Sequence, residues 1–130
     1  MSVSPWTFQQ ARQAAHEASA RQQRAEQTLR EASAALAEAE RAYRRKLAET
    51  ILTLRAEGTA ATACGDIARG NNLVSDLRYK RDVAEGVLEA AKQAAWRLTA
   101  DRKDVHQFAA WSLRRELAEN GDHTPLEAVA

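Results

Sequence analysis

Small and apolar residues recur along the first half of the chain at alternating intervals of three and four, with polar residues between them. The repeat occupies Ala11, Ala15, Ala18, Ala25, Leu29, Ala32, Leu36, Ala39, Tyr43, Leu47, Ile51 and Leu54. No glycine or proline lies between Trp6 and Glu57. A 3-4 spacing aligns these side chains in one stripe along a helix, as in a coiled-coil seam. The pattern therefore predicts a long helix over residues 6–57.

The same spacing returns in the second half of the chain. It includes Leu77, Ala84, Leu88, Ala91, Ala95, Leu98, Val105 and Ala109. Gly86 is the only glycine or proline between Asn72 and Glu119. The pattern predicts a second long helix over residues 72–119, joined to the first by a turn over residues 58–71 and followed by a flexible tail over residues 122–130.

The residues at the predicted helix ends have the chemistry of helix caps. Ser4 is expected to cap the first helix, with Pro5 at its first position, and Thr7 is a second candidate for the cap. Gly58 is expected to end this helix. Asn71 or Asn72 can cap the second helix.

The connector between the helices has several residues that suit a turn. Thr59 or Thr62 can cap a short turn, and Gly65 with Asp66 is expected to bend the chain. Asp66 can also accept a hydrogen bond from Arg69. Most of the connector therefore has a structural explanation.

Two helices of similar length joined by a short connector predict an all-α fold, with residues 1–121 forming an antiparallel coiled-coil hairpin. The hairpin could also pair with a second copy into a four-helix bundle. A turn centred on residues 64 and 65 would place residue i opposite residue 129 − i, so that Tyr43 packs on Gly86 and Trp96 lies opposite Ala32 to Ser33. This register predicts that Gly86→Leu lowers the melting temperature.

Aromatic and aliphatic residues gather where the predicted hairpin is open. This expected interface comprises Trp6, Phe8, Val105, Phe108, Trp111 and Leu113. Two helices cannot shield so many large side chains from water, and exposed apolar patches mark interaction sites. We expect a homodimer contact here, or a groove for a foreign protein.

Composition favours a helical protein without catalytic or metal chemistry. The chain of 130 residues has 29 alanines, two prolines and a net charge of +1. Cys64 is the only cysteine, and the three histidines, His16, His106 and His123, are far apart in the sequence. No metal, cofactor or catalytic group is expected. The absence of a signal sequence or a long apolar run predicts a cytoplasmic protein that does not enter the membrane.

Basic residues cluster before and after the connector. The candidate contacts for nucleic acid or a partner are Arg69, Arg78, Arg81, Lys80, Arg44 and Arg45. They could hold phosphates through guanidinium forks. Alternatively, they could form ion pairs, with Arg44 near Glu85 and Lys46 near Asp82 in the predicted register. The small net charge makes nucleic acid the less favoured partner.

Part of the sequence resembles a family of small helical proteins. The matching positions are Tyr43, Leu47, Ile51, Leu54, Arg55, Gly58, Thr62, Asp66, Ile67, Ala68, Arg69, Gly70, Val74, Leu77, Arg78, Arg81, Asp82, Ala84 and Glu85. This pattern is similar to proteins of unassigned function from phages and prophages of Gram-positive bacteria, and the preference for arginine over lysine suggests an actinobacterial host. The resemblance implies a phage context near recombination genes and no established chemistry.

Three functional hypotheses follow from these patterns. The first is a non-enzymatic, dimeric helical hairpin that acts through protein contacts. The second is a nucleic-acid accessory protein of phage replication or recombination. The third is a phage-encoded inhibitor of a host defence complex.

Overall fold

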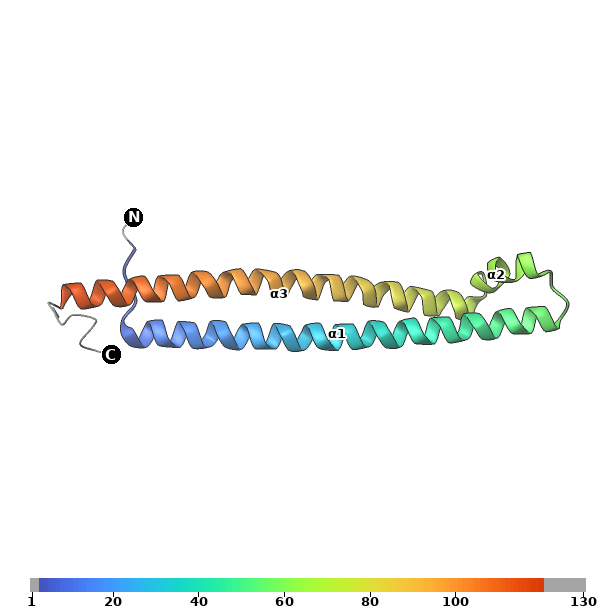
Figure 1. The fold of residues 1–130 in the computed structure, drawn as a ribbon, viewed down its shortest axis with the longest axis horizontal. Coiled ribbons are helices and arrows are strands. Elements are labelled where there is room, and N and C mark those ends of the chain that lie inside the picture. The colour runs from blue at the N-terminus through green and yellow to red at the C-terminus, as the bar shows by residue number, and fades with distance from the viewer. Residues whose placement is uncertain (1–2, 121–130) are drawn as a thin grey trace. The chain divides into compact units, whose positions relative to one another are not determined.

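A computed structural model describes residues 3–120 of the chain, and within this range every regular element is a helix. Helix α1 spans Phe8–Ala56, α2 spans Ala61–Arg69 and α3 spans Asn72–Glu119 (Figure 1). The long helices α1 and α3 pack against each other. The all-α prediction is therefore confirmed, while the tail predicted over residues 122–130 lies outside the described residues.

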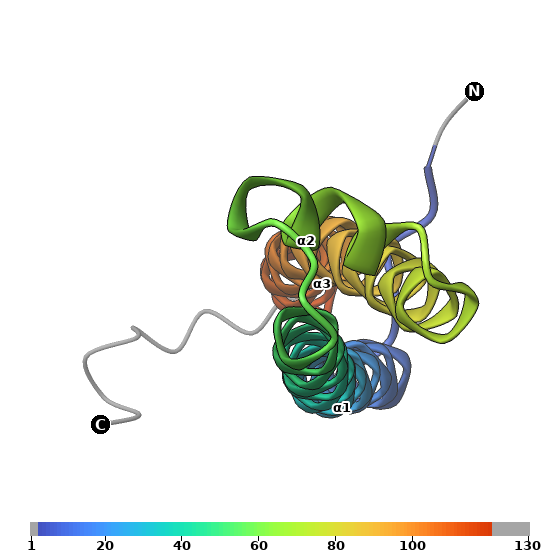
Figure 2. The same ribbon diagram turned by 90° about the vertical axis from the view of Figure 1, so that its right-hand side faces the viewer.

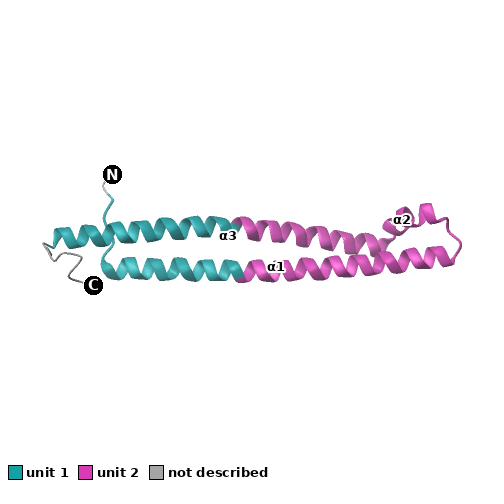
Figure 3. Cartoon of the chain, in the orientation of Figure 1, with its two compact units in different colours: residues 1–26, 94–130 teal, residues 27–93 magenta. Residues whose placement is uncertain are grey.

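The chain divides into two compact units, each built from parts of both long helices (Figure 3). Unit 1 consists of residues 1–26 and 94–130, and unit 2 of residues 27–93. Unit 1 thus holds the start of α1 and the end of α3, whereas unit 2 holds the remainder of both and all of α2.

Helix α1 begins later than predicted because Thr7, and not Ser4, supplies its cap. The Gln10 amide donates to Thr7 Oγ1 at 3.2 Å, and the Thr7 amide donates to Gln10 Oε1 at 3.0 Å. These reciprocal bonds form a capping box, which satisfies two backbone donors that the helix leaves free. Pro5 therefore lies before the helix and not in its first turn.

Gly58 ends α1, as predicted, because its backbone adopts a left-handed conformation with φ of 90°. Its amide donates to Arg55 O at 3.1 Å, and the Thr59 amide donates to Leu54 O at 3.0 Å. This pair of bonds is a Schellman motif, which glycine adopts without the steric cost that a Cβ atom would add.

Asn71 caps α3, also as predicted. Its Oδ1 accepts from the amides of Leu73 at 2.9 Å and Val74 at 3.3 Å. Val74 is completely buried, so the cap fixes the point at which α3 enters the core of unit 2. The boundaries predicted for the second helix, residues 72–119, match those of α3.

The connector is not a simple turn, because nine of its residues form α2. Gly65, predicted as a bend, lies inside this helix, and no side chain of Thr59 or Thr62 caps it. Cys64 and Ala68, one helical turn apart, are both buried. Figures 1 and 2 both show α2 on the α3 side of the α1 axis.

The residues of the predicted seams are buried or half-buried throughout the described helices. In unit 1 the most buried seam residues are Ala11, Ala18 and Ala109, and in unit 2 they are Ala32, Tyr43 and Ala91. Alanines allow two helices to approach closely, and the few larger residues fill the remaining space. The 3-4 spacing therefore identified the buried faces correctly.

The predicted register was wrong by about two helical turns. Arg21 reaches Asp101, where the rule 129 − i predicts residue 108, and Arg81 reaches Glu40, where it predicts residue 48. The cause is α2, which lies beside the last turns of α1 (Figure 1), so that α3 begins farther back along α1.

Two predicted contacts fail with that register. A Cβ atom added to Gly86 would meet no atom within 4 Å, so Tyr43 does not pack on this glycine. Trp96 is 77% exposed and therefore does not pack opposite Ala32 and Ser33 as predicted. Gly86→Leu is therefore not expected to lower the melting temperature through a clash with Tyr43.

Candidate functional site

Three of the aromatic residues predicted to form an interface, Trp6, Phe108 and Trp111, come together in unit 1. The rings of Trp6 and Phe108 lie edge to face, with centroids 4.5 Å apart and planes inclined by 82°. The Trp111 ring lies 5.3 Å from Phe108 at 35°. Edge-to-face and tilted contacts of this kind stabilise aromatic pairs beyond the burial of their surface.

Ser112 holds the segment before α1 against α3. The Trp6 amide donates to Ser112 Oγ at 3.0 Å, and Ser112 has no exposed surface. A buried hydroxyl requires a partner, and this backbone amide supplies one. Sequence reasoning missed Ser112, although a small polar residue one position after Trp111 and three after Ala109 lies on the buried side of the helix.

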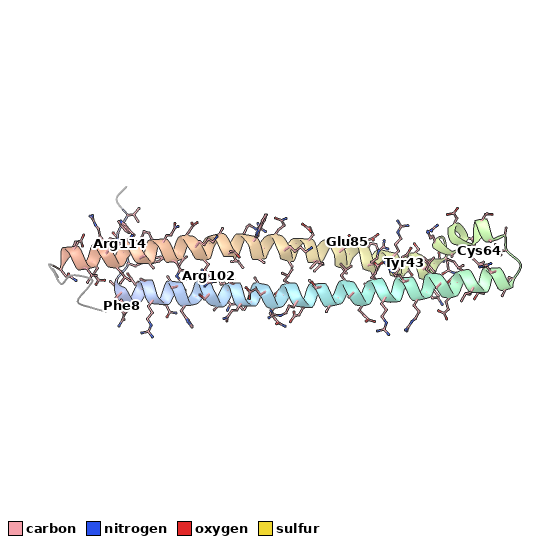
Figure 4. The ribbon with its side chains drawn as sticks, viewed as in Figure 1. Phe8, Tyr43, Cys64, Glu85, Arg102 and Arg114 are labelled. Atoms are coloured by element: carbon pink, nitrogen blue, oxygen red, sulfur yellow. The ribbon has the colours of Figure 1, made fainter. Side chains whose placement is uncertain are left out.

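The side chains of the predicted interface differ in how much of their surface is exposed. Phe8 is 56% exposed and Trp111 is 37% exposed, whereas Trp6, Phe108, Val105 and Leu113 are half-buried. Figure 4 places Phe8 at the start of α1. Phe8 and Trp111 are thus the members of this set whose surface remains most available to a partner.

Polar contacts join α1 and α3 beside the cluster. Gln22 interrupts the apolar seam, and its Nε2 donates to Thr99 Oγ1 at 3.2 Å while its Oε1 accepts from Arg102 at 2.8 Å. Arg21 adds an ion pair with Asp101 at 3.4 Å. The interruption in the seam is therefore a polar link between the helices of unit 1.

In unit 2 the central basic residue is Arg81, which points from α3 toward α1. Its guanidinium carbon lies 4.6 Å from the centroid of the Tyr43 ring, and Figure 4 shows Tyr43 between α1 and α3. Its nitrogens reach Asp82 at 2.9 Å and Glu40 at 3.6 Å. The hydrogen bond to Asp82 raises the pKa of Arg81. Arg81 therefore links α3 to α1 through stacking and charge.

Two more candidate arginines are paired within their own helices. Arg69 reaches Asp66 at 3.0 Å, and Arg44 reaches Glu40 at 2.8 Å instead of the predicted Glu85. Lys46 likewise lies 3.8 Å from Glu49 and not beside Asp82. Such exposed pairs contribute only a few tenths of a kcal/mol, about 0.3–0.5 for neighbours one turn apart.

The other three candidates, Arg45, Arg78 and Lys80, are exposed. None of them has an ion pair within residues 3–120. The structure thus divides the predicted basic site into one inward residue, two residues neutralised by nearby carboxylates and three free cations.

The described residues contain no cluster of three or more side chains suited to hold a metal ion. His16 and His106 are exposed on different helices, α1 and α3, and His123 lies outside the described residues. Cys64 is buried and donates to Thr59 O at 3.6 Å. None of the helices in residues 3–120 has the length and apolar character needed to span a membrane.

The described part of the chain is thus an all-helical protein with an aromatic cluster in one unit and an arginine link in the other. Comparison with protein-family models, with curated proteins and with solved structures found no match. The resemblance to phage proteins stays a prediction.

Proposed function

We propose that the chain is a non-enzymatic interaction protein of phage origin, built as an antiparallel hairpin of α1 and α3 that self-associates. The observation that supports this proposal is the number of large apolar side chains that the helix pair leaves in water. They include Phe8 at 56%, Leu52 at 67%, Tyr79 at 70% and Trp96 at 77% exposure. Contiguous apolar patches on a protein surface mark contact sites for other proteins, whereas single exposed apolar side chains are common.

The aromatic cluster of unit 1 is the proposed contact surface for a protein partner. Trp111 and Phe8 expose part of their rings, while Trp6 and Ser112 hold Phe108 in place from within the chain. Rigid aromatic side chains lose little entropy on binding and often supply most of the affinity at protein interfaces. A preformed cluster therefore suits recognition better than isolated surface residues would.

A nucleic-acid accessory role is the second candidate, favoured by the three free cations Arg45, Arg78 and Lys80. It ranks below a protein partner because carboxylates already neutralise Arg44, Arg69 and Arg81 at distances of 2.8–3.0 Å. Binding to phosphates would have to break these contacts before it gained new ones.

Sedimentation equilibrium of the full chain tests the proposal. We expect the average mass to rise from that of one chain to that of two as the concentration increases. A mobility shift with single- and double-stranded DNA at about 50 mM salt tests the second candidate. A single-chain mass at all concentrations, together with a DNA shift that Arg78→Ala and Lys80→Ala abolish, would reverse the ranking.

A further inference from the structure

Helix α3 carries a second row of apolar and small residues in unit 2, apart from its buried seam. The row consists of Tyr79, Val83, Gly86, Val87 and Ala90. Tyr79, Val83 and Val87 are 70%, 47% and 53% exposed. Their spacing of three to four residues places them on one face of the helix. A helix with a single partner needs only one such face.

Helix α1 carries a matching row of small residues, Ala35, Ala39 and Ala42, of which Ala39 also belongs to the edge of the seam, followed one turn later by Lys46. On α3, Val87 lies nearest the seam on the same side of the helix pair as the α1 row, while Tyr79 and Gly86 lie farther round toward the outer face. On the opposite side a shallow groove is lined by Ser33, Leu36, Ala37 and Glu40 of α1 and by Arg81, Glu85 and Leu88 of α3. On each helix the row lies across the seam from the groove residues, because a step of one residue turns the helix by about 100°.

Gly86 has no function within a single chain. Its backbone is helical, and a Cβ atom at this position would meet nothing within 4 Å. Glycine inside a helix costs about 1 kcal/mol relative to alanine. Glycine here is explained if another backbone approaches this face from outside the chain.

We propose that these two rows form the face through which two copies of the chain pair, which rests on the self-association proposed above. The pairing has a two-fold axis parallel to the helices, so that α3 of one copy lies on α1 of the other. A rotation about this axis does not shift the copies along it, so each residue lies at the same height along the axis in both copies.

The levels follow from the contact between Arg81 and Glu40 within one chain. Tyr79 lies two residues before Arg81 on α3, and Ala42 lies two residues after Glu40 on α1. In the proposed antiparallel pair, Tyr79 and Ala42 therefore lie at the same height along the helix axes. By the same rule Val83 and Val87 fall, to within one residue, at the levels of two further alanines in the α1 row. Each large side chain of the α3 row therefore meets an alanine of the partner subunit.

Charge complementarity identifies the occupant as a second copy. Lys46 lies six residues after Glu40 on α1, and the residue six before Arg81 on α3 is at position 75. Lys46 therefore lies within one residue of the height of Asp76 along the helix axes. Asp76 lies in line with Tyr79 and Val83 on α3 and has no ion pair among the described residues. In the paired copies each Lys46, which lies 3.8 Å from Glu49 within its own helix, also faces Asp76 of the partner subunit, once on each side of the axis. Opposite charges at the end of an apolar contact fix its register.

A charge exchange between two variants tests this contact. Lys46→Glu alone and Asp76→Lys alone place like charges together in both contacts of a dimer, and each should raise the dissociation constant at least about tenfold. An equal mixture of the two variants restores opposite charges in both contacts of the mixed dimer. Sedimentation of the full chains should therefore show dimers in the mixture and monomers in each variant alone.

Gly86→Leu provides a second test, because leucine fits a single chain but fills the space that the partner subunit would occupy. It should sediment as a monomer with unchanged helical circular dichroism. Ala34→Leu, at an exposed α1 position outside both rows, is the matched control and should remain dimeric.

The outcomes separate this inference from the proposed function. If the unaltered chain stays monomeric at every concentration, self-association itself is refuted. If the chain dimerises but Gly86→Leu also dimerises and the charge variants do not recognise each other, this face is refuted and self-association stands. In that case Phe108→Ala and Trp111→Ala test the aromatic cluster as the contact.

Discussion

Replacing Gly86 by alanine should stabilise the monomeric protein. The residue is exposed in the interior of α3, and its added methyl group would contact nothing within 4 Å apart from the adjacent backbone of its own helix. The substitution therefore gains helix propensity and narrows the conformations of the unfolded chain, while no packing is disturbed. The expected gain in the free energy of unfolding is about 1 kcal/mol.

The corresponding shift in melting temperature follows from the size of the chain. An unfolding entropy of about 2.1 cal/mol/K per residue gives roughly 0.27 kcal/mol/K for 130 residues. A gain of about 1 kcal/mol should thus raise the melting temperature by about 3–4 °C. Thermal unfolding followed by circular dichroism measures this shift, at a concentration where sedimentation shows monomers.

Gly58→Ala is the matched control, because the same methyl group is added where nothing lies within 4 Å but φ is +90°. An L-residue in this conformation costs roughly 1–2 kcal/mol, so the melting temperature should fall. Both glycines have room for a Cβ atom, and the two positions differ in their backbone conformation. A lower melting temperature for Gly86→Ala in the monomer would refute the reading of α3 as a helix whose Gly86 face is open.

The Gly86 variant also responds to concentration. In a dimer paired through the two rows, the added methyl group would separate α3 from the partner subunit. The gain in melting temperature should therefore shrink as the concentration rises into the dimeric range. A gain that stays constant while the chain dimerises would place the dimer contact on another face.

Asn71→Ala should lower the free energy of unfolding by about 1 kcal/mol, measured by urea titration, because two amides at the start of α3 lose their acceptor. Arg81→Met should cost about 1 kcal/mol in the same assay through the lost stacking on Tyr43, while Arg78→Met, at an exposed unpaired arginine, should cost nothing measurable. Equal effects of the two arginine substitutions would contradict the inward role of Arg81. Trp111→Ala should leave helicity unchanged and weaken binding to a partner of unit 1, measured by isothermal titration once such a partner is isolated.

The regular parts of the fold were predictable because they depend on local chemistry. The 3-4 spacing found the buried faces of both long helices, and the left-handed preference of Gly58 and the side-chain acceptor of Asn71 fixed two of their ends. The aromatic cluster followed from the same periods, since Trp6 and Phe108 do meet. Each of these features is decided by a few neighbouring residues.

The features that were missed depend on long-range packing. The glycine and threonines around Cys64 suggested a turn, but burial of Cys64 and Ala68 on one face stabilises a short helix there. Once α2 lies beside the end of α1, α3 must begin about two turns earlier along α1 than a simple turn allows. The error in register then propagated to Gly86 and Trp96.

The observed register changes the role assigned to the basic residues more than the role assigned to the apolar residues. With the predicted offset, Arg44 was expected near Glu85, whereas Arg78 and Arg81 had no assigned partner, so a phosphate was a candidate ligand for them. At the observed offset Arg81 lies over Tyr43 and reaches Glu40, which in turn accepts from Arg44. A single carboxylate thus satisfies two of the cations that a nucleic-acid site would need. The connector end of unit 2 is better explained as a link between helices, and the surface that lacks an explanation within one chain is the row around Gly86.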